Sequence, residues 1–192
     1  MSSLFSIRRA TASLFAVAMV LTTTGALMSA PAEESRSPEY QVKAAFLYHF
    51  AKFVDWPPQA FARPDSPLII TVAGEDVFGG DLERIVKNKT INGHPLIVRH
   101  VNAVADLKPS HVLFISSSEQ KRLPEILNAV RGESVLTVSE TNDFLASGGM
   151  INFLIEENKV HFEINNEAAK RAGLKISAKL LALATRVENG VD

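Results

Sequence analysis

Apolar residues recur with helical spacing along residues 40–58. At about 100° per residue, the large apolar side chains fall on one arc of this helix and polar side chains on the opposite arc. The expected core-facing positions are Val42, Phe46, Leu47, Phe50, Phe53 and Val54, and the expected solvent-facing positions are Gln41, Tyr48, Lys52 and Asp55. Lys43 lies within the apolar arc, near enough to the helix start for its amine to reach water. The pattern predicts an amphipathic helix with one wet side.

Both ends of this helix are marked in the sequence. Ser37 can cap the free amide groups of the first turn, and Pro38 suits the first helical position because it lacks an N–H group. Pro57 disfavours helical geometry at Trp56, and Pro58 opposes continuation. We therefore expect a helix that starts at Pro38 and stops before Pro57.

Strand and helix patterns alternate along the next part of the chain. The predicted strands are residues 68–73, 96–101, 111–115 and 135–138, the predicted helices are residues 80–88 and 119–131, and residues 141–146 form a short helix or turn. Ser118 can cap the second of these helices, and Pro124 bends or delays it. Short, fully apolar strands separated by helices predict a parallel sheet covered on both faces.

The pattern then changes to a hairpin. Residues 150–155 and 160–164 alternate around a polar turn, with Asn152, His161 and Glu163 on the expected wet face. Two short helices follow, the first capped by Asn165 or Asn166 and ended by Gly173, the second capped by Ser177 and carrying Leu180, Leu181, Ala184 and Val187. The predicted fold class is α/β: a Rossmann- or flavodoxin-like, mostly parallel sheet flanked by helices, with an antiparallel hairpin near the C-terminus, in a single domain over residues 37–188.

The first 32 residues have the features of an export signal. Arg8 and Arg9 precede an apolar run over residues 10–21 that is too short to span a bilayer comfortably, and small residues end at Ala32. We expect a signal peptide over residues 1–32, cleaved after Ala32, and an exported mature chain without stable membrane insertion. An uncleaved anchor is the alternative.

Charge and composition exclude several classes of partner and of chemistry. Without the two leader arginines, 18 basic residues stand against 21 acidic ones, a net charge of about −3. This balance offers no steering field for nucleic acid or for an anionic membrane surface. The chain has no cysteine, which excludes thiol catalysis and thiolate metal sites, and a core of this size folds without disulfides.

Two loops follow neighbouring predicted strands at their carboxyl ends, where parallel sheets bind ligands. The first contains Gly74 and Glu75 and starts like a phosphate-binding loop, but Gly80 and Asp81 stand where such a loop needs Lys and Ser or Thr. Residues 116–118 are three serines at a helix start, where hydroxyls and amides hold an anion or simply cap the helix. Gly74, Glu75, Ser116 and Ser117 are the candidate ligand-binding residues.

No pattern in the sequence supports catalysis. The five histidines show no metal-ligand spacing on one element, and no Gly-x-Ser-x-Gly turn is present. We therefore predict that the protein is not an enzyme and holds neither a metal nor a cofactor.

Five stretches between Tyr40 and Ala184 form an ordered set: YQVKAAFLYHFAKFVDWP, VAGEDVFGGDLERIVKNKTINGHPL, HVLFISSSE, VLTVSE and GGMINFLIEENKVHFEINNEAAKRAGLKISAKLLALA. In this order and spacing they resemble the YfiR-like family of periplasmic proteins. The family's named member binds the periplasmic sensor domain of an inner-membrane diguanylate cyclase and holds the enzyme off. The resemblance implies a periplasmic, non-catalytic repressor in cyclic-di-GMP signalling that an envelope signal releases.

The sequence departs from this family at two places. Many members carry cysteines near the first strand and just before the HVLFI strand, where this chain has Thr71-Val72 and Ser110. A paired loss is expected when a disulfide between neighbouring strands is dispensed with. It puts redox control of this protein in doubt.

Aromatic residues on a helix edge are common anchors at protein interfaces. We predict Tyr48, Lys52, Phe53 and Trp56 as partner-binding residues, with Lys52 as a charge at the rim. The alternative is a periplasmic small-molecule-binding domain that feeds a sensor kinase or another membrane receptor. The exposed aromatic surface is compatible with a homodimer.

Overall fold

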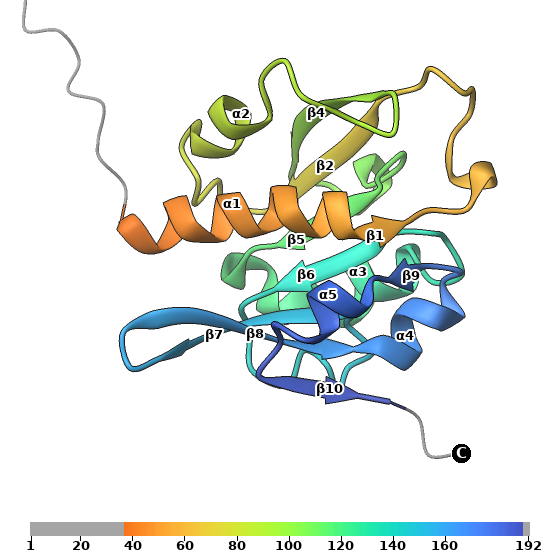
Figure 1. Cartoon of the computed structure of the whole chain (residues 1–192). Helices are drawn as coiled ribbons and strands as arrows, with labels where there is room; N and C mark the ends of the chain where they lie inside the picture. Colours follow the sequence, from red (N-terminus) through yellow and green to blue (C-terminus); the bar gives the residue numbers. More distant parts are fainter. Residues whose placement is uncertain (1–36, 190–192) are drawn as a thin grey trace, which may run out of the picture. The chain divides into compact units, whose positions relative to one another are not determined.

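The computed structural model describes residues 37–189, and the predicted signal peptide, residues 1–32, lies outside them. Its main sheet has the strand order β10-β8-β7-β6-β5-β2-β4-β3 (Figure 1). The strands are β2 (Leu68–Ala73), β3 (Thr90–Ile91), β4 (His94–Val101), β5 (Val112–Ile115), β6 (Leu136–Ser139), β7 (Ile151–Glu156), β8 (Lys159–Asn165) and β10 (Arg186–Glu188). Parallel pairs connect β4, β2, β5, β6 and β7, and β7–β8 is an antiparallel hairpin. The predicted fold class is confirmed.

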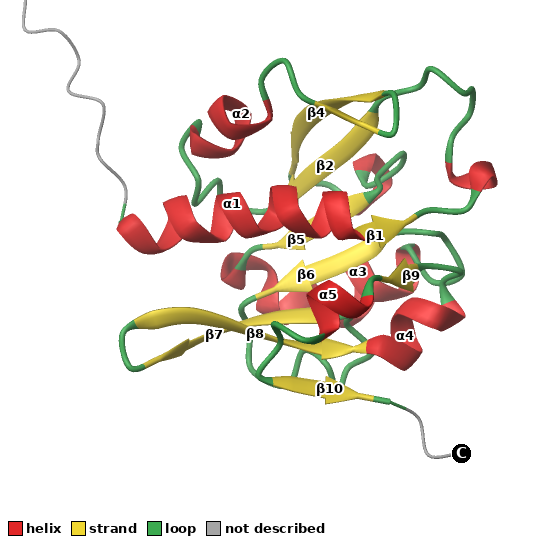
Figure 2. Ribbon diagram, in the orientation of Figure 1, coloured by secondary structure: helices red, strands yellow, loops and turns green. Residues whose placement is uncertain are grey.

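Helices cover both faces of this sheet (Figure 2). They are α1 (Pro38–Phe53), α2 (Asp81–Val86), α3 (Leu123–Ala129), α4 (Asn166–Arg171) and α5 (Ala178–Leu181), with 3-10 turns η1 (Pro58–Ala60), η2 (Val104–Asp106) and η3 (Ser117–Arg122). Ser37, Asn165 and Ser177 accept the capping hydrogen bonds that the sequence suggests. Pro124 falls where η3 gives way to α3, in agreement with the expected delay. A small second sheet pairs β1 (Val54–Asp55) with β9 (Lys175–Ile176).

Two separate cores follow from the alternation of side chains along each strand. In β5, Val112 and Phe114 join the core under α1, whereas Leu113 and Ile115 join the core that contains Leu123 and Ile126 around α3. In Figure 1, α1 runs across the near face of the sheet and α3 lies behind it. The sheet is therefore buried on both faces, as its apolar strands require.

Helix α1 packs with a different arc than the apolar pattern predicts. Its buried residues are Lys43, Ala44, Leu47, Phe50 and Ala51, whose mean direction is rotated by roughly 70° from the predicted arc. Val42, expected in the core, is 44% exposed, and Phe46 and Phe53 are half-buried. Small alanines let the helix approach its neighbours closely, so part of its large apolar side stays at the surface.

The environment of Lys43 also differs from the prediction. The prediction that its amine reaches water was wrong: the residue is 3% exposed. Its ammonium group donates to Glu39 on the same helix and to Glu140, 2.5 Å away, just after β6. The Tyr40 hydroxyl donates to the same Glu140 carboxylate at 3.2 Å. Burial, reinforced by Glu140, raises the pKa of Tyr40 to about 12. The two carboxylates pair the buried ammonium charge, so the amine does not need to reach solvent.

Two predictions near the C-terminus also fail. Asn152 is 4% exposed rather than wet, because β7 pairs in register with both β6 and β8 and lies inside the sheet. Phe144 and Leu145, in the turn before the hairpin, fill the core on the other sheet face. Val187 belongs to β10, which adds to β8 in parallel, and not to the last helix, which ends at Leu181.

Thr71 and Ser110 lie at the places where the sequence resemblance implies that a disulfide has been dispensed with. Both side chains are buried, and their hydroxyl oxygens lie 2.6 Å apart. Because Ser110 donates to the Leu107 carbonyl, the Thr71 hydroxyl is the donor between the two. The side chain of the neighbouring Val72 instead belongs to the core under α1. A hydrogen bond between buried hydroxyls therefore joins β2 to the residue pair before β5.

The contributions of Lys43 and Glu140 to the free energy of unfolding are expected to be strongly coupled. Lys43→Met leaves a nearly buried carboxylate without its cation and should lower the free energy of unfolding by about 3 kcal/mol. Adding Glu140→Gln should restore part of the loss, giving a coupling of about 1–3 kcal/mol in a double-mutant cycle from urea denaturation. The exposed Lys108–Glu133 pair, changed in the same way, is the control and should couple by less than about 0.5 kcal/mol. Additive losses at Lys43 and Glu140 would contradict this account.

Cysteines at positions 71 and 110 should form a disulfide. The two residues are 39 apart in sequence, so oxidation of Thr71→Cys/Ser110→Cys should raise the free energy of unfolding by about 2–4 kcal/mol over the reduced form. Thiol titration and denaturation of both forms measure the effect. Thr71→Cys alone controls for the lost hydrogen bond. Two free thiols after oxidation would show that the side chains do not face each other.

Candidate functional site

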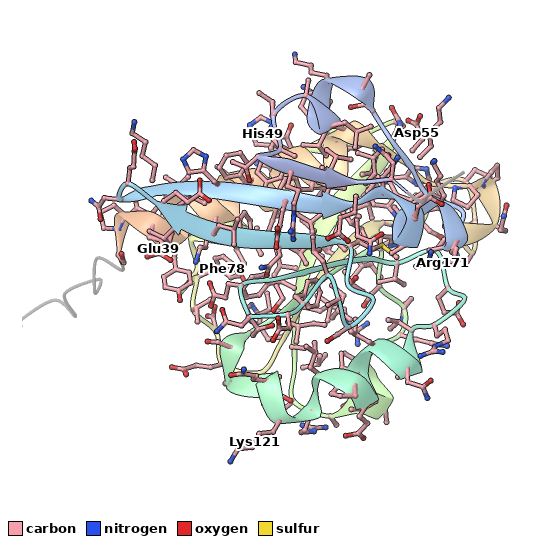
Figure 3. All side chains as sticks on the ribbon, turned by 90° about the horizontal axis from the view of Figure 1, so that it is seen from below. Glu39, His49, Asp55, Phe78, Lys121 and Arg171 are labelled. Carbon is pink, nitrogen blue, oxygen red and sulfur yellow. The ribbon has the colours of Figure 1, made fainter. Side chains whose placement is uncertain are left out.

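The outward side of α1 presents aromatic and cationic side chains. Tyr48 and Phe53 are half-buried, and His49 and Lys52 are exposed. The rings of His49 and Phe53 stack with centroids 6.0 Å apart and an interplanar angle of 13°. We call the group formed by Tyr48, His49, Lys52 and Phe53 the α1 face. Figure 3 shows His49 on the side of the molecule opposite Lys121.

Two further elements bring lysines to the α1 face. Lys89, between α2 and β3, places its amine 5.0 Å from the centroid of the Tyr48 ring. Lys179 of α5 places its amine 5.2 Å from the centroid of the Phe53 ring, and the Lys52 amine lies 5.9 Å from that centroid. Partial burial, together with Lys52, Lys89 and Lys179, lowers the pKa of His49. Three of the predicted partner-binding residues thus share one surface with two lysines that the sequence reasoning did not select.

Trp56, the fourth predicted partner-binding residue, belongs to a different feature. It lines a cavity of about 420 Å³ together with Pro58, Phe61, Leu68, Ile91 and His94. The Phe61 ring lies between two imidazoles, 3.8 Å from His94 and 4.5 Å from His111 between centroids. The walls are therefore mainly aromatic and aliphatic, as is usual for small-molecule sites.

His111 is buried and neutral. Burial lowers its pKa to about 4, against a weaker opposing effect of the Ala60 backbone. Its Nδ1 accepts from the Ile69 amide at 3.1 Å, so the proton of the neutral ring is on Nε2. Nε1 of Trp56 is buried and has no hydrogen-bond partner among residues 37–189, and the Ala60 backbone is the polar group near Nε2 of His111. At least one buried donor therefore adjoins the rings of the cavity, and a buried donor of this kind calls for an acceptor.

Sequence reasoning did not find this cavity. Its residues come from the segment after α1, from the start of β2 and from the β3–β4 turn, and each has an ordinary local explanation. Stacking between Phe61 and the two histidines exists only when these segments meet. The Trp56-Pro57-Pro58 helix stop was the one visible signal, because it places the indole where the chain leaves α1.

The predicted ligand-binding loops do meet, since β2 and β5 are adjacent. The Glu75 amide donates to the Ser118 hydroxyl at 3.0 Å, and the Ser118 amide donates to the Ser116 hydroxyl at 3.4 Å. Gly74 has φ +89°, and a Cβ atom there would lie 2.5 Å from the Ser118 hydroxyl oxygen. The hollow beside Gly74 measures about 10 Å³, no more than one water molecule requires. These loops satisfy one another's polar groups and cap η3.

Ser117 instead borders an open depression of about 470 Å³ near the Lys43 ion pairs. Glu39, Glu140 and Glu156 give it an acidic lining, and the Lys43 charge is already paired with two of these carboxylates. Glu156 and Ser117 also border the depression, and neither takes part in the ion pairs of Lys43. Across residues 37–189, no three His, Asp or Glu side chains converge in a way that could hold a metal ion.

None of the helices within residues 37–189 is long and apolar enough to cross a membrane. The α1 face and the cavity beside Trp56 are two features with different chemistry: the first is cationic and aromatic, and the second is apolar and concave.

Two solved structures resemble this chain. A conserved domain protein from Vibrio cholerae O1 biovar El Tor matches with a TM-score of 0.50 and 14% identity, over 79% of this chain and 60% of its own. The ABC domain in complex with L-Trp from Streptococcus pneumoniae matches with a TM-score of 0.49 and 9% identity, over 78% and 60%. This chain thus spans about 60% of the length of each. The first likeness shows a shared fold and nothing about function.

A search among curated proteins found no significant match. The model of the YfiR/HmsC-like family, in contrast, matches residues 40–185, from the start of α1 to the segment before β10. This range includes the α1 face, the cavity beside Trp56 and the Thr71–Ser110 pair. The chain belongs to the YfiR/HmsC-like family, a family of periplasmic regulators in cyclic-di-GMP signalling.

Proposed function

We propose that this protein is a non-catalytic periplasmic repressor, which binds the periplasmic sensor domain of an inner-membrane diguanylate cyclase and inhibits the enzyme. The observation that carries this proposal is the orientation of α1. The helix turns away from its most apolar arc and leaves aromatic rings and lysines at the surface. Such a surface suits recognition of another protein, and the family is regulatory.

Inhibition requires differential affinity. The repressor must bind the inactive state of the cyclase more tightly than the active one, and a difference of about 3 kcal/mol shifts the balance more than a hundredfold. A few interface hot spots supply this much free energy. Tyr48 and Phe53 are suited to that role because each offers a ring that is only partly covered.

The polar chemistry of the described residues also favours binding over catalysis. In the acidic depression, Lys43 and Tyr40 are held by hydrogen bonds to Glu39 and Glu140. His111 is neutral and buried, and its Nδ1 is occupied by a backbone amide. A general acid or base needs access to substrate, and these groups lack it.

Tyr48→Ala with Lys52→Ala should weaken repression. Both side chains lie at the surface of α1, so the double variant should raise cyclic-di-GMP in cells that co-express the chain with an inner-membrane diguanylate cyclase that the wild type represses. Its melting temperature should remain within about 3 °C of the wild type, because neither side chain is buried. Lys121→Ala with Lys159→Ala, both exposed on other elements, is the control. Unchanged repression, or a large loss of stability, would count against this surface.

The cavity beside Trp56 favours a second function, the binding of a small molecule that informs the same or another membrane receptor. Its volume falls within the range of known small-molecule sites, and at least one buried donor adjoins it. This candidate places the ligand next to Trp56, since the loops at Gly74 and Ser116 are closed by their own hydrogen bonds. Both functions are compatible, because a repressor needs a releasing signal.

Trp56 is the only tryptophan of the chain, so its fluorescence reports on this cavity. Among envelope metabolites, a true ligand should change the emission and, at a hundred times its dissociation constant, stabilise the fold by about 2.7 kcal/mol. Phe61→Leu should reduce both responses, whereas Phe46→Leu, on α1, should leave them intact. Stabilisation without any change in emission would place the ligand elsewhere.

A further inference from the structure

The lysines of the α1 face lack carboxylate partners. Among residues 37–189, Lys52, Lys89 and Lys179 form no ion pair, as is also true of exposed lysines such as Lys121 and Lys159. What distinguishes the three is that they gather around His49. The three come from α1, from the segment after α2 and from α5, so the tertiary fold alone brings them together. The whole chain is slightly acidic, with a net charge of −1. The positive charge of the α1 face is therefore local and opposite in sign to the net charge of the chain. Such a surface complements a negatively charged partner.

Aromatic rings lie close beneath these cations. Phe53 has the Lys52 and Lys179 amines at 5.9 and 5.2 Å from its centroid, and Tyr48 has the Lys89 amine at 5.0 Å. Cation–π attraction favours these positions, which reduces the entropy that each long side chain loses on binding. All three ammonium groups are solvent-exposed, so each retains donors for a carboxylate.

The centre of the same surface is flat and weakly polar. His49 stacks on Phe53 with an interplanar angle of 13°. Partial burial and the neighbouring lysines lower the pKa of His49. A pair of stacked rings is suited to receive an apolar side chain, with the lysines around it as a charged rim.

We propose that the α1 face binds an acidic segment of a partner protein, in which carboxylates meet Lys52, Lys89 and Lys179 and an apolar side chain packs on the His49–Phe53 stack. This inference rests on the proposed function and defines the chemistry of the sensor-domain segment that the repressor recognises. A protein segment fits better than an anionic bilayer, because three lysines are fewer than the roughly four to eight basic residues of a typical lipid-binding cluster.

Binding of the purified periplasmic domain of the repressed cyclase tests the inference by titration calorimetry at 50 and 300 mM NaCl. The wild-type dissociation constant should rise roughly tenfold or more over this range, because exposed charge pairs are screened by salt. The variant Lys52→Glu/Lys89→Glu/Lys179→Glu should bind at least about 30-fold more weakly at the lower salt concentration. Its affinity should also be nearly independent of salt.

A control of equal charge change separates local from global effects. Lys121→Glu/Arg131→Glu/Lys159→Glu alters exposed residues on other elements, and it should retain affinity within about threefold. The variant Lys52→Gln/Lys89→Gln/Lys179→Gln should give an intermediate loss. Circular dichroism melts confirm that each variant is folded.

The outcomes distinguish the inference from the proposed function. If the domain binds and responds to Tyr48→Ala but not to salt or to the lysine substitutions, the acidic partner is refuted and the repressor function stands. If the lysines instead mediate binding to phosphatidylglycerol vesicles and not to the domain, the surface serves a membrane and the inference is wrong. If the wild type does not bind the domain at all, both fail.

Discussion

The buried Lys43 ammonium group constrains much of the arrangement of this protein. Burial of a lysine is costly unless its charge is paired, and the carboxylates that pair it come from Glu39, one turn earlier, and from Glu140 after β6. The second partner is 97 residues away in sequence, so this contact fixes the rotation of α1 relative to the sheet. Once that rotation is set, Leu47 and Phe50 reach the core and Val42 does not.

The same rotation connects packing to recognition. An α1 buried by its most apolar arc would hide Phe46 and Phe53 completely and turn other residues outward. The observed helix buries Ala44 and Ala51 and keeps the Phe53 ring partly accessible beside Lys52 and Lys179. Part of the apolar surface of α1 is therefore left unburied, and it forms a surface of rings and cations.

Thr71 and Ser110 show how the fold manages without a disulfide. Their hydroxyls are buried and joined to each other and to the Leu107 carbonyl, so no polar atom of the pair is left unsatisfied. A hydrogen bond contributes less than a disulfide, because it does not restrict the unfolded chain. Two continuous cores on the faces of the sheet supply the remaining stability, and the chain carries no thiol through which oxidation could act.

The sequence by itself determined the elements whose causes are local. Apolar runs and turn residues marked β2 and the neighbouring strands, and Ser37, Pro57, Asn165 and Ser177 marked helix ends, because capping and proline geometry act within a few residues. Family motifs located the chain among periplasmic regulators. Tertiary structure alone decided the burial of Lys43 and Asn152, the sheet position of Val187, the cavity between Phe61 and the histidines, and the gathering of Lys52, Lys89 and Lys179. Each of these depends on which distant segments meet, and the free energy of burying a polar or charged group is set by partners that periodicity cannot identify.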